Sequence, residues 1–274
     1  MSRTENLASR TILTMAIFFT LFPILWIGVT SLKYPRDILS ARLFFQPTLN
    51  NYVAVLFGRG SDIPRYFLNS LAIAGSSTFL SIVVASLSAF GFSRFEFPGN
   101  LDKYVLGFLL FLRMLFPIAL AIPFYVLTRE LKIGDTIFAV IMAHTAVNIP
   151  FAVWMLKAFF DSVPQSIEEA ARIDGCSWTQ VLLRITLPAT APGVAASGIF
   201  VFILSWNDYL FPAVLTSSKA MTLPVGLANY VQENIVAWER IAAGATLYMI
   251  PVFLFTLLIQ NHLVKGFTLG GMGK

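Results

Sequence analysis

The chain of 274 residues is 57% hydrophobic and only 12% charged, and its mean hydropathy is +0.76. Soluble globular chains carry about 25% charged residues, so this composition excludes an ordinary soluble domain and indicates a protein that lies mainly in the lipid bilayer. The net charge of +5 does not indicate a nucleic-acid partner, because the basic residues are scattered singly and form no stripe.

Six segments are apolar and long enough to cross a bilayer, which requires about 20 residues for about 30 Å of hydrocarbon. They cover residues 12–32, 68–92, 104–126, 137–159, 191–215 and 241–264. No small-residue cleavage site follows the first of them, so we expect it to be retained as a span. Prolines within the spans, such as Pro117 and Pro150, are expected to mark kinks, because neighbouring helices satisfy the freed carbonyl groups.

We therefore predict an all-α integral membrane fold with six transmembrane helices in a single domain over residues 1–274. An even number of spans places both termini on the same side of the membrane. Lysine and arginine residues are equally numerous on the two sides, so the positive-inside rule does not decide which side that is. The connection of residues 33–67 is long enough to fold and is expected to cap the outer face.

Polar side chains inside the spans must find partners, because hydrocarbon offers none. Arg113 lies within the third span, where a cation costs roughly 2.5–3.5 kcal/mol on insertion scales, so it should face a polar cavity. Two interpretations stay open: Arg113 contacts hydroxyls or an anionic group of a ligand, or it pairs with Asp208 or with backbone carbonyls. Asn148 and His144 in the fourth span are expected to point into the bundle, with helix-to-helix hydrogen bonding as the alternative to ligand contact.

Residues 160–190 are polar enough to leave the membrane, but they are patterned as two short helices. The first begins near Pro164, and Ile167, Ala170 and Ala171 follow at the i, i+3, i+4 spacing of one helix face. Gly175 is expected to end this helix, since glycine adopts the left-handed conformation without a Cβ penalty.

The second helix is predicted from a capping box formed by Ser177 and Gln180. It continues through Leu183 and is expected to stop before Pro188, because proline interrupts a helix interior.

The first of these helices has the features of a docking element. Ala170 and Ala171 are small enough for a close approach to another backbone, and Glu168 and Glu169 suit the positive end of the helix dipole and leave a carboxylate free for a basic or hydroxyl partner. A helix lying on lipid headgroups is the alternative, although acidic residues fit an anionic surface poorly.

The spacing of Glu169-Ala170-Ala171, Gly175, Ile185 and Leu187-Pro188 resembles the EAA motif of ABC importer permeases at every signature position. The resemblance extends over essentially the whole chain, to the carbohydrate-uptake branch and to the second permease of the maltose transporter. It is carried further by Trp206-Asn207-Asp208, Thr222-Leu223-Pro224, Asn69-Ser70 and the glycine-rich tail of residues 265–274.

The resemblance implies that the first loop helix is a cytoplasmic coupling helix, which docks in a cleft of a separate ATPase. Its contact residues would be Glu168, Glu169, Ala170, Ala171, Asp174 and Gly175. Both termini would then be cytoplasmic in a bacterial inner membrane, and Thr268, Gly270 and Gly271 of the tail would reach the ATPase subunits.

The implied assembly contains a homologous second permease, two copies of the ATP-binding subunit and an extracytoplasmic solute-binding protein, surrounded by membrane lipid. The chain has no phosphate-binding loop of the G-x-x-x-x-G-K-[ST] type, so ATP and Mg²⁺ are expected to belong to the partner ATPase and the chain itself is no enzyme. Two histidines and one cysteine suggest no metal site.

The implied substrate is a small carbohydrate, whose apolar face stacks on aromatic rings and whose hydroxyls bind amides and carboxylates. Residues expected along the translocation path are Arg113, Asn148, Trp206, Asn207 and Asp208. Two other functions stay open at this point: an ion-driven secondary transporter with Arg113, His144 and Asp208 as a relay, and a membrane scaffold without transport activity.

Overall fold

The computed structural model describes residues 3–231 and 236–270, and within these ranges the chain is helical without a named strand. The helices run in the order α1 (Arg3–Ser31), α2 (Pro35–Leu39), α3 (Asn50–Phe57), α4 (Ile63–Arg94), η1 (Pro98–Asn100), α5 (Leu101–Met114), α6 (Pro117–Glu130), α7 (Ile137–Asp161), α8 (Gln165–Ile173), α9 (Trp178–Val181), η2 (Leu182–Thr186), α10 (Leu187–Ala189), α11 (Ala191–Trp206), α12 (Leu210–Leu215), α13 (Leu223–Ala228) and α14 (Trp238–Gly270). The predicted all-α class is confirmed.

Four helices are long and apolar enough to cross a membrane, and two bent helix pairs bring the number to six if each pair is one span. The four are Arg10–Ser31, Ile63–Arg94, Ile137–Asp161 and Trp238–Leu257. The pairs are Pro98–Met114 with Pro117–Glu130, bent by 96°, and Trp178–Ala189 with Ala191–Trp206, bent by 84°. The chain is a multi-pass membrane protein with four to six spans.

The third predicted span, residues 104–126, is divided at Leu115 and Phe116. Both residues have extended backbone, with ψ angles of 142° and 128°, and Pro117 begins α6. The residue before a proline is pushed out of the helical region by contact with the proline ring, so Pro117 begins a new helix after a break. The fifth predicted span is likewise interrupted, because α11 ends at Trp206 and α12 begins at Leu210.

The chain divides into two compact units. The first consists of Met1–Phe67 and Val225–Pro251, and the second of Leu68–Pro224 and Val252–Lys274. In the first unit, Asn51 ties α3 to the end of α1, because its side-chain amide donates to the carbonyls of Ser31 and Lys33 at 2.8 and 2.9 Å.

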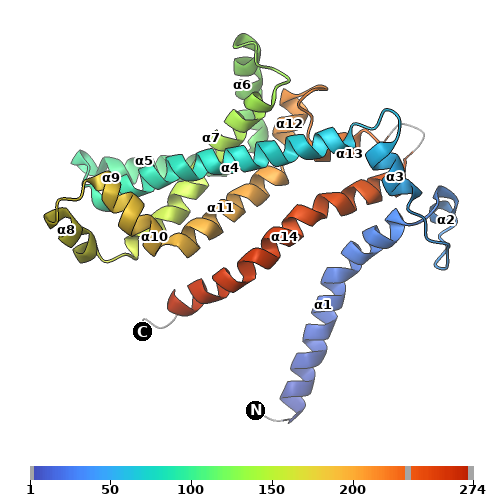
Figure 1. Ribbon diagram of the computed structural model, residues 1–274, viewed down its shortest axis with the longest axis horizontal. Coiled ribbons are helices and arrows are strands. Elements are labelled where there is room, and N and C mark those ends of the chain that lie inside the picture. The colour runs from blue at the N-terminus through green and yellow to red at the C-terminus, as the bar shows by residue number, and fades with distance from the viewer. Residues whose placement is uncertain (1–2, 232–235, 271–274) are drawn as a thin grey trace. The chain divides into compact units, whose positions relative to one another are not determined.

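The second unit is organised around α7, which contributes to two hydrophobic clusters. One cluster joins α7 to α4, α5, η2 and α11 through small and large side chains that include Ala89, Leu156 and Phe160. The other joins α7 to α4, α6 and α12 and includes Val140 and Phe211. Figure 1 shows α8 and α9 at the end of this unit that lies away from α6 and α12.

At the α6–α7 connection, Asp135 fixes the loop that follows α12. Its carboxylate accepts backbone N–H bonds from each of residues 217–220, at 3.0 to 3.3 Å. Partial burial acts to raise the pKa of Asp135, but these N–H donors outweigh burial and hold the pKa well below its ordinary value. The charged form of Asp135 therefore holds the two loops together.

Asp135→Asn should lower the stability of the protein at neutral pH and should flatten its acid dependence. The pKa of Asp135 is lower in the folded than in the unfolded chain, so its stabilisation is present above the ordinary value of about 3.9 and is lost as the pH falls further. Thermal unfolding midpoints in detergent between pH 7 and 3 measure this effect. Asp102→Asn, which removes a carboxylate that accepts none of these bonds, is the control; equal acid dependence of wild type and Asp135→Asn would contradict the assignment.

Candidate coupling site

Helix α8 ends as the sequence predicts, at a glycine with left-handed backbone. Gly175 has a φ of +89°, and its N–H donates to the carbonyl of Arg172 at 3.1 Å. Asp174 is the C-cap, and its N–H reaches the carbonyl of Ala170 at 3.0 Å. At the other end, Pro164 is the N-cap and makes no side-chain cap. The predicted termination at Gly175 is confirmed.

The predicted capping box of the second loop helix is confirmed too. The Gln180 N–H donates to Ser177 Oγ at 3.3 Å, and the Ser177 N–H donates to Gln180 Oε1 at 2.7 Å. Trp178 in the first turn packs edge to face on Phe90 and Phe95, with ring centroids 6.2 and 5.1 Å away. These aromatic contacts attach α9 to the end of α4.

The expectation that this helix stops before Pro188 is wrong. α9 continues into a π-helical turn, η2, and Pro188 lies inside α10. In a regular helix the proline ring would clash with the carbonyl four residues earlier, whereas the wider π turn changes that spacing and accommodates the ring. The helical path therefore continues past Pro188 to Ala189, breaks at Thr190 and bends by 84° into α11.

The environment of Glu168 is where the observed site differs most from the predicted one. Its side chain is 2% exposed and forms an ion pair with Arg94, the last residue of α4, whose side chain is 4% exposed. Arg94 Nε contacts Glu168 Oε2, Arg94 Nη2 donates to Glu168 Oε1 at 2.9 Å, and Thr186 Oγ1 donates to the same oxygen at 2.7 Å. Both carboxylate oxygens thus accept hydrogen bonds within the chain, and the Glu168 side chain, which was predicted to contact the ATPase, is buried.

Arg94 also holds the end of α7. Its Nη2 group donates to the carbonyls of Phe160 at 2.8 Å and Val163 at 3.3 Å, where α7 gives way to α8. One guanidinium therefore joins α4, the α7–α8 turn and α8, and Glu168 extends the network to η2. A buried cation with carboxylate and carbonyl acceptors satisfies the geometric requirements of a stable buried ion pair.

The outer face of α8 is open. Glu169 and Ala170 are exposed, and Ile167 and Ile173 are 52% and 87% exposed. Ala171 is half-buried against the core. Glu169 is therefore the carboxylate of α8 that remains exposed, and Ile173 follows it one turn later on the same side of the helix.

The polar residues inside the helices form a hydrogen-bonded chain that includes His144. His144 Nε2 contacts Asp208 Oδ2 at 3.0 Å, and His144 Nδ1 contacts Ser205 Oγ at 2.6 Å. Ser205 in turn bonds Ser77 of α4 at 2.9 Å. These bonds connect α4, α7 and the α11–α12 junction, so His144 is a helix-to-helix contact.

Arg113 is not the partner of Asp208. Its guanidinium lies 5.6 Å from the ring centre of Phe151, and it lines a cavity of about 230 Å³ together with Pro117 and Pro150. Asp208 bonds His144 instead, so the relay through Arg113, His144 and Asp208 is not assembled.

The remaining residues predicted along the path do not line the Arg113 cavity. Asn148 is buried on α7, Trp206 is buried and stacks on Phe202 with ring centroids 5.6 Å apart, and Asn207 is exposed at the break after α11.

Of the predicted tail contacts, Thr268 and Gly270 belong to the last turns of α14, and Gly271 lies outside the described residues. Within the described part of the chain, no group of histidine, cysteine and acidic side chains could hold a metal ion.

Residues 81–269 match the family model described as binding-protein-dependent transport system inner membrane component. The chain is 32% identical to the trehalose transport system permease protein SugB of Mycobacterium tuberculosis, over 94% of each chain. It is also 32% identical to the trehalose/maltose transport system permease protein MalG of Thermococcus litoralis, over 92% of this chain and 91% of that one.

Among solved structures, a bacterial ABC transporter involved in the import of the acidic polysaccharide alginate matches 95% of this chain and 98% of its own, with a TM-score of 0.79 and 21% identity. This similarity shows a shared fold.

Arg94→Met should destabilise the folded protein by about 3–5 kcal/mol, because it leaves the buried Glu168 carboxylate without its cation. Equilibrium unfolding in detergent measures the change. Lys157→Met is the matched control: Lys157 pairs with Asp161 at 2.7 Å in a partly exposed position, and such pairs contribute roughly 0.2–1 kcal/mol.

Adding Glu168→Leu to Arg94→Met should recover most of that loss, because no buried charge then remains unpaired. A loss for Arg94→Met no larger than the loss for Lys157→Met would contradict this assignment.

Proposed function

Because the chain belongs to the binding-protein-dependent transport system inner membrane components, we propose that this ABC importer permease moves a sugar or a sugar derivative. Its relatives from Mycobacterium tuberculosis and Thermococcus litoralis are named for trehalose and for trehalose and maltose. The chain covers more than nine-tenths of each. The chain is not an enzyme, and a separate ATPase subunit hydrolyses the ATP.

The observation that carries the coupling proposal is the exposed face of α8 on a rigidly held helix. Glu169 is exposed, while Glu168 on the same helix is bonded to Arg94 and Thr186. A helix docked in an ATPase cleft would transmit the movement of the ATPase only if it could not slide on its own protein. The Arg94–Glu168 bond supplies that attachment.

This role requires α8 and both termini to lie on the cytoplasmic side of a bacterial inner membrane. The proposed assembly adds a homologous second permease, two copies of the ATPase and an extracytoplasmic solute-binding protein. Docking of the binding protein outside would favour closure of the ATPase inside, and α8 would pass the closure to α4 and α7.

Arg113 is proposed to line the translocation path. Its charge lies beside a cavity at the break between α5 and α6, among apolar side chains. A guanidinium there can donate to sugar hydroxyls or to an acidic sugar derivative. Asn148, Trp206, Asn207 and Asp208 stay weaker candidates, because they do not line that cavity.

Glu169→Ala should leave the protein inserted and assembled but should uncouple ATP hydrolysis from uptake. Loss of one charge-assisted hydrogen bond corresponds to roughly a tenfold fall in uptake. Uptake of labelled sugar and ATP hydrolysis are measured in proteoliposomes that contain the whole importer. Glu130→Ala, an exposed carboxylate at the end of α6, is the control. Wild-type uptake by Glu169→Ala would refute the coupling proposal.

Arg113→Ala should lower uptake by about tenfold at unchanged expression and assembly, since a hydrogen bond from a charged donor to the substrate is lost. The control is Lys103→Ala, which removes an exposed cation from the first turn of the same helix, α5. Unchanged transport by Arg113→Ala would exclude Arg113 from the path.

A further inference from the structure

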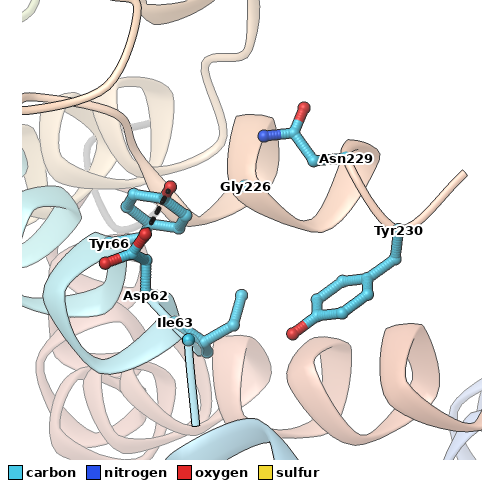
Figure 2. Close-up of a pocket in the computed structure, with 7 residues that line it drawn as sticks. Asp62, Ile63, Tyr66, Gly226, Asn229 and Tyr230 are labelled. Atoms are coloured by element: carbon cyan, nitrogen blue, oxygen red, sulfur yellow. Dashed lines mark hydrogen bonds between the residues drawn. The ribbon is translucent and has the colours of Figure 1, made fainter.

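The first unit contains a cavity of about 200 Å³ that the coupling mechanism does not use. It lies between the start of α4 and the chain that follows α13, two segments of the same unit. Figure 2 shows Asp62, Ile63 and Tyr66 on one side of the cavity and Asn229 and Tyr230 on the other. Two tyrosines, a carboxylate and an amide therefore surround one small space.

The wall formed by Tyr66 is held in place by its surroundings. Tyr66 is 9% exposed, and a Cβ atom on Gly226 would lie 2.1 Å from the Tyr66 ring, so the ring packs where only glycine leaves room. The Tyr66 hydroxyl points to Asp62 Oδ2 at 3.5 Å (Figure 2). The Arg65 guanidinium also lies over the Tyr66 ring, 5.5 Å from its centre. Tyr66 is therefore a fixed wall of the cavity, and the half-buried ring of Tyr230 is the aromatic surface on which a ligand would stack.

The charge of the cavity is already balanced. Arg65 Nη2 lies 3.1 Å from Asp62 Oδ1, and the Asp62 side chain is 51% exposed. Asp62 can therefore accept hydrogen bonds from a ligand, but no unneutralised carboxylate attracts an incoming cation. This balance favours an uncharged ligand that carries hydroxyl groups.

The size of the cavity restricts the ligand further. Sites for drug-sized molecules measure about 300–1,000 Å³, so a cavity of about 200 Å³ suits one ring. Tyrosine rings offer an apolar face to the C–H groups of a sugar. The carboxylate of Asp62 supplies hydrogen-bond acceptors.

We propose that this cavity is a subsite for one uncharged pyranose ring, which stacks on the ring of Tyr230 and donates hydroxyl hydrogen bonds to Asp62. The inference rests on the proposed function, under which residues 33–67 and the connection between α12 and α14 lie on the outer face. A sugar would contact this subsite outside the membrane before or after it enters the translocation path. A cationic side chain of the solute-binding protein is the competing occupant, and the Arg65–Asp62 pair argues against it.

Saturation-transfer NMR on the full chain in lipid nanodiscs tests the proposal. The probes are the methyl α-glycosides of glucose, galactose and mannose, with N-acetyl-lysine amide as the cationic probe. At least one glycoside should receive saturation on its ring protons. Asp62→Asn and Tyr230→Ala should each weaken its binding roughly tenfold, while Tyr209→Ala, at the exposed start of α12, should bind as wild type.

An unfolding temperature equal to that of wild type checks that each variant is folded. Asp62→Asn is included because it keeps the shape of the cavity, which Tyr230→Ala changes. The proposal is overturned if no glycoside receives saturation, if both cavity variants bind the glycoside as tightly as wild type, or if N-acetyl-lysine amide alone binds. If only the subsite is wrong, the whole importer still takes up sugar at the expense of ATP. If the proposed function is wrong, no ATP-driven sugar uptake is measured, whatever the glycoside signal.

Discussion

The buried ion pair between Arg94 and Glu168 is the constraint on which the coupling site depends. Moving two charges out of water costs several kcal/mol for each ion, and here the cost is offset by carbonyl acceptors around Arg94 and by the hydroxyl of Thr186. The same bonds fix α8 to the ends of α4 and α7. A displacement of α8 must therefore move these helices, which is the mechanical property that a coupling helix needs.

Two of the apolar segments are interrupted at defined places. α5 and α6 are bent by 96° at the break before Pro117, and the segment of Trp178–Ala189 meets α11 at 84°. Interruptions of this kind are tolerated at membrane depth where they are buried in protein or line a cavity, and the cavity beside Arg113 lies at the first of them. The first break therefore brings Arg113 and a cavity together.

Local sequence signals predicted the coupling loop well, because its turns depend on neighbouring residues. Gly175 and the Ser177–Gln180 box could be placed from spacing alone, and both are confirmed. The burial of Glu168 could not be predicted in this way, since its partner Arg94 is 74 residues away in the chain and an acid near a helix start normally faces solvent. The passage of the helix through Pro188 could not be predicted either, because the π turn that precedes the proline has no recognisable residue pattern.

The ratio of sugar imported to ATP hydrolysed tests the central claim most directly. It would be measured in proteoliposomes that contain the whole importer, for wild type and for Glu168→Gln, at a temperature at which both remain folded. Glutamine keeps the size of the side chain but removes the charge that holds Arg94. If α8 transmits movement through this ion pair, ATP hydrolysis should continue while the imported sugar per ATP falls several-fold. An unchanged ratio would contradict the account.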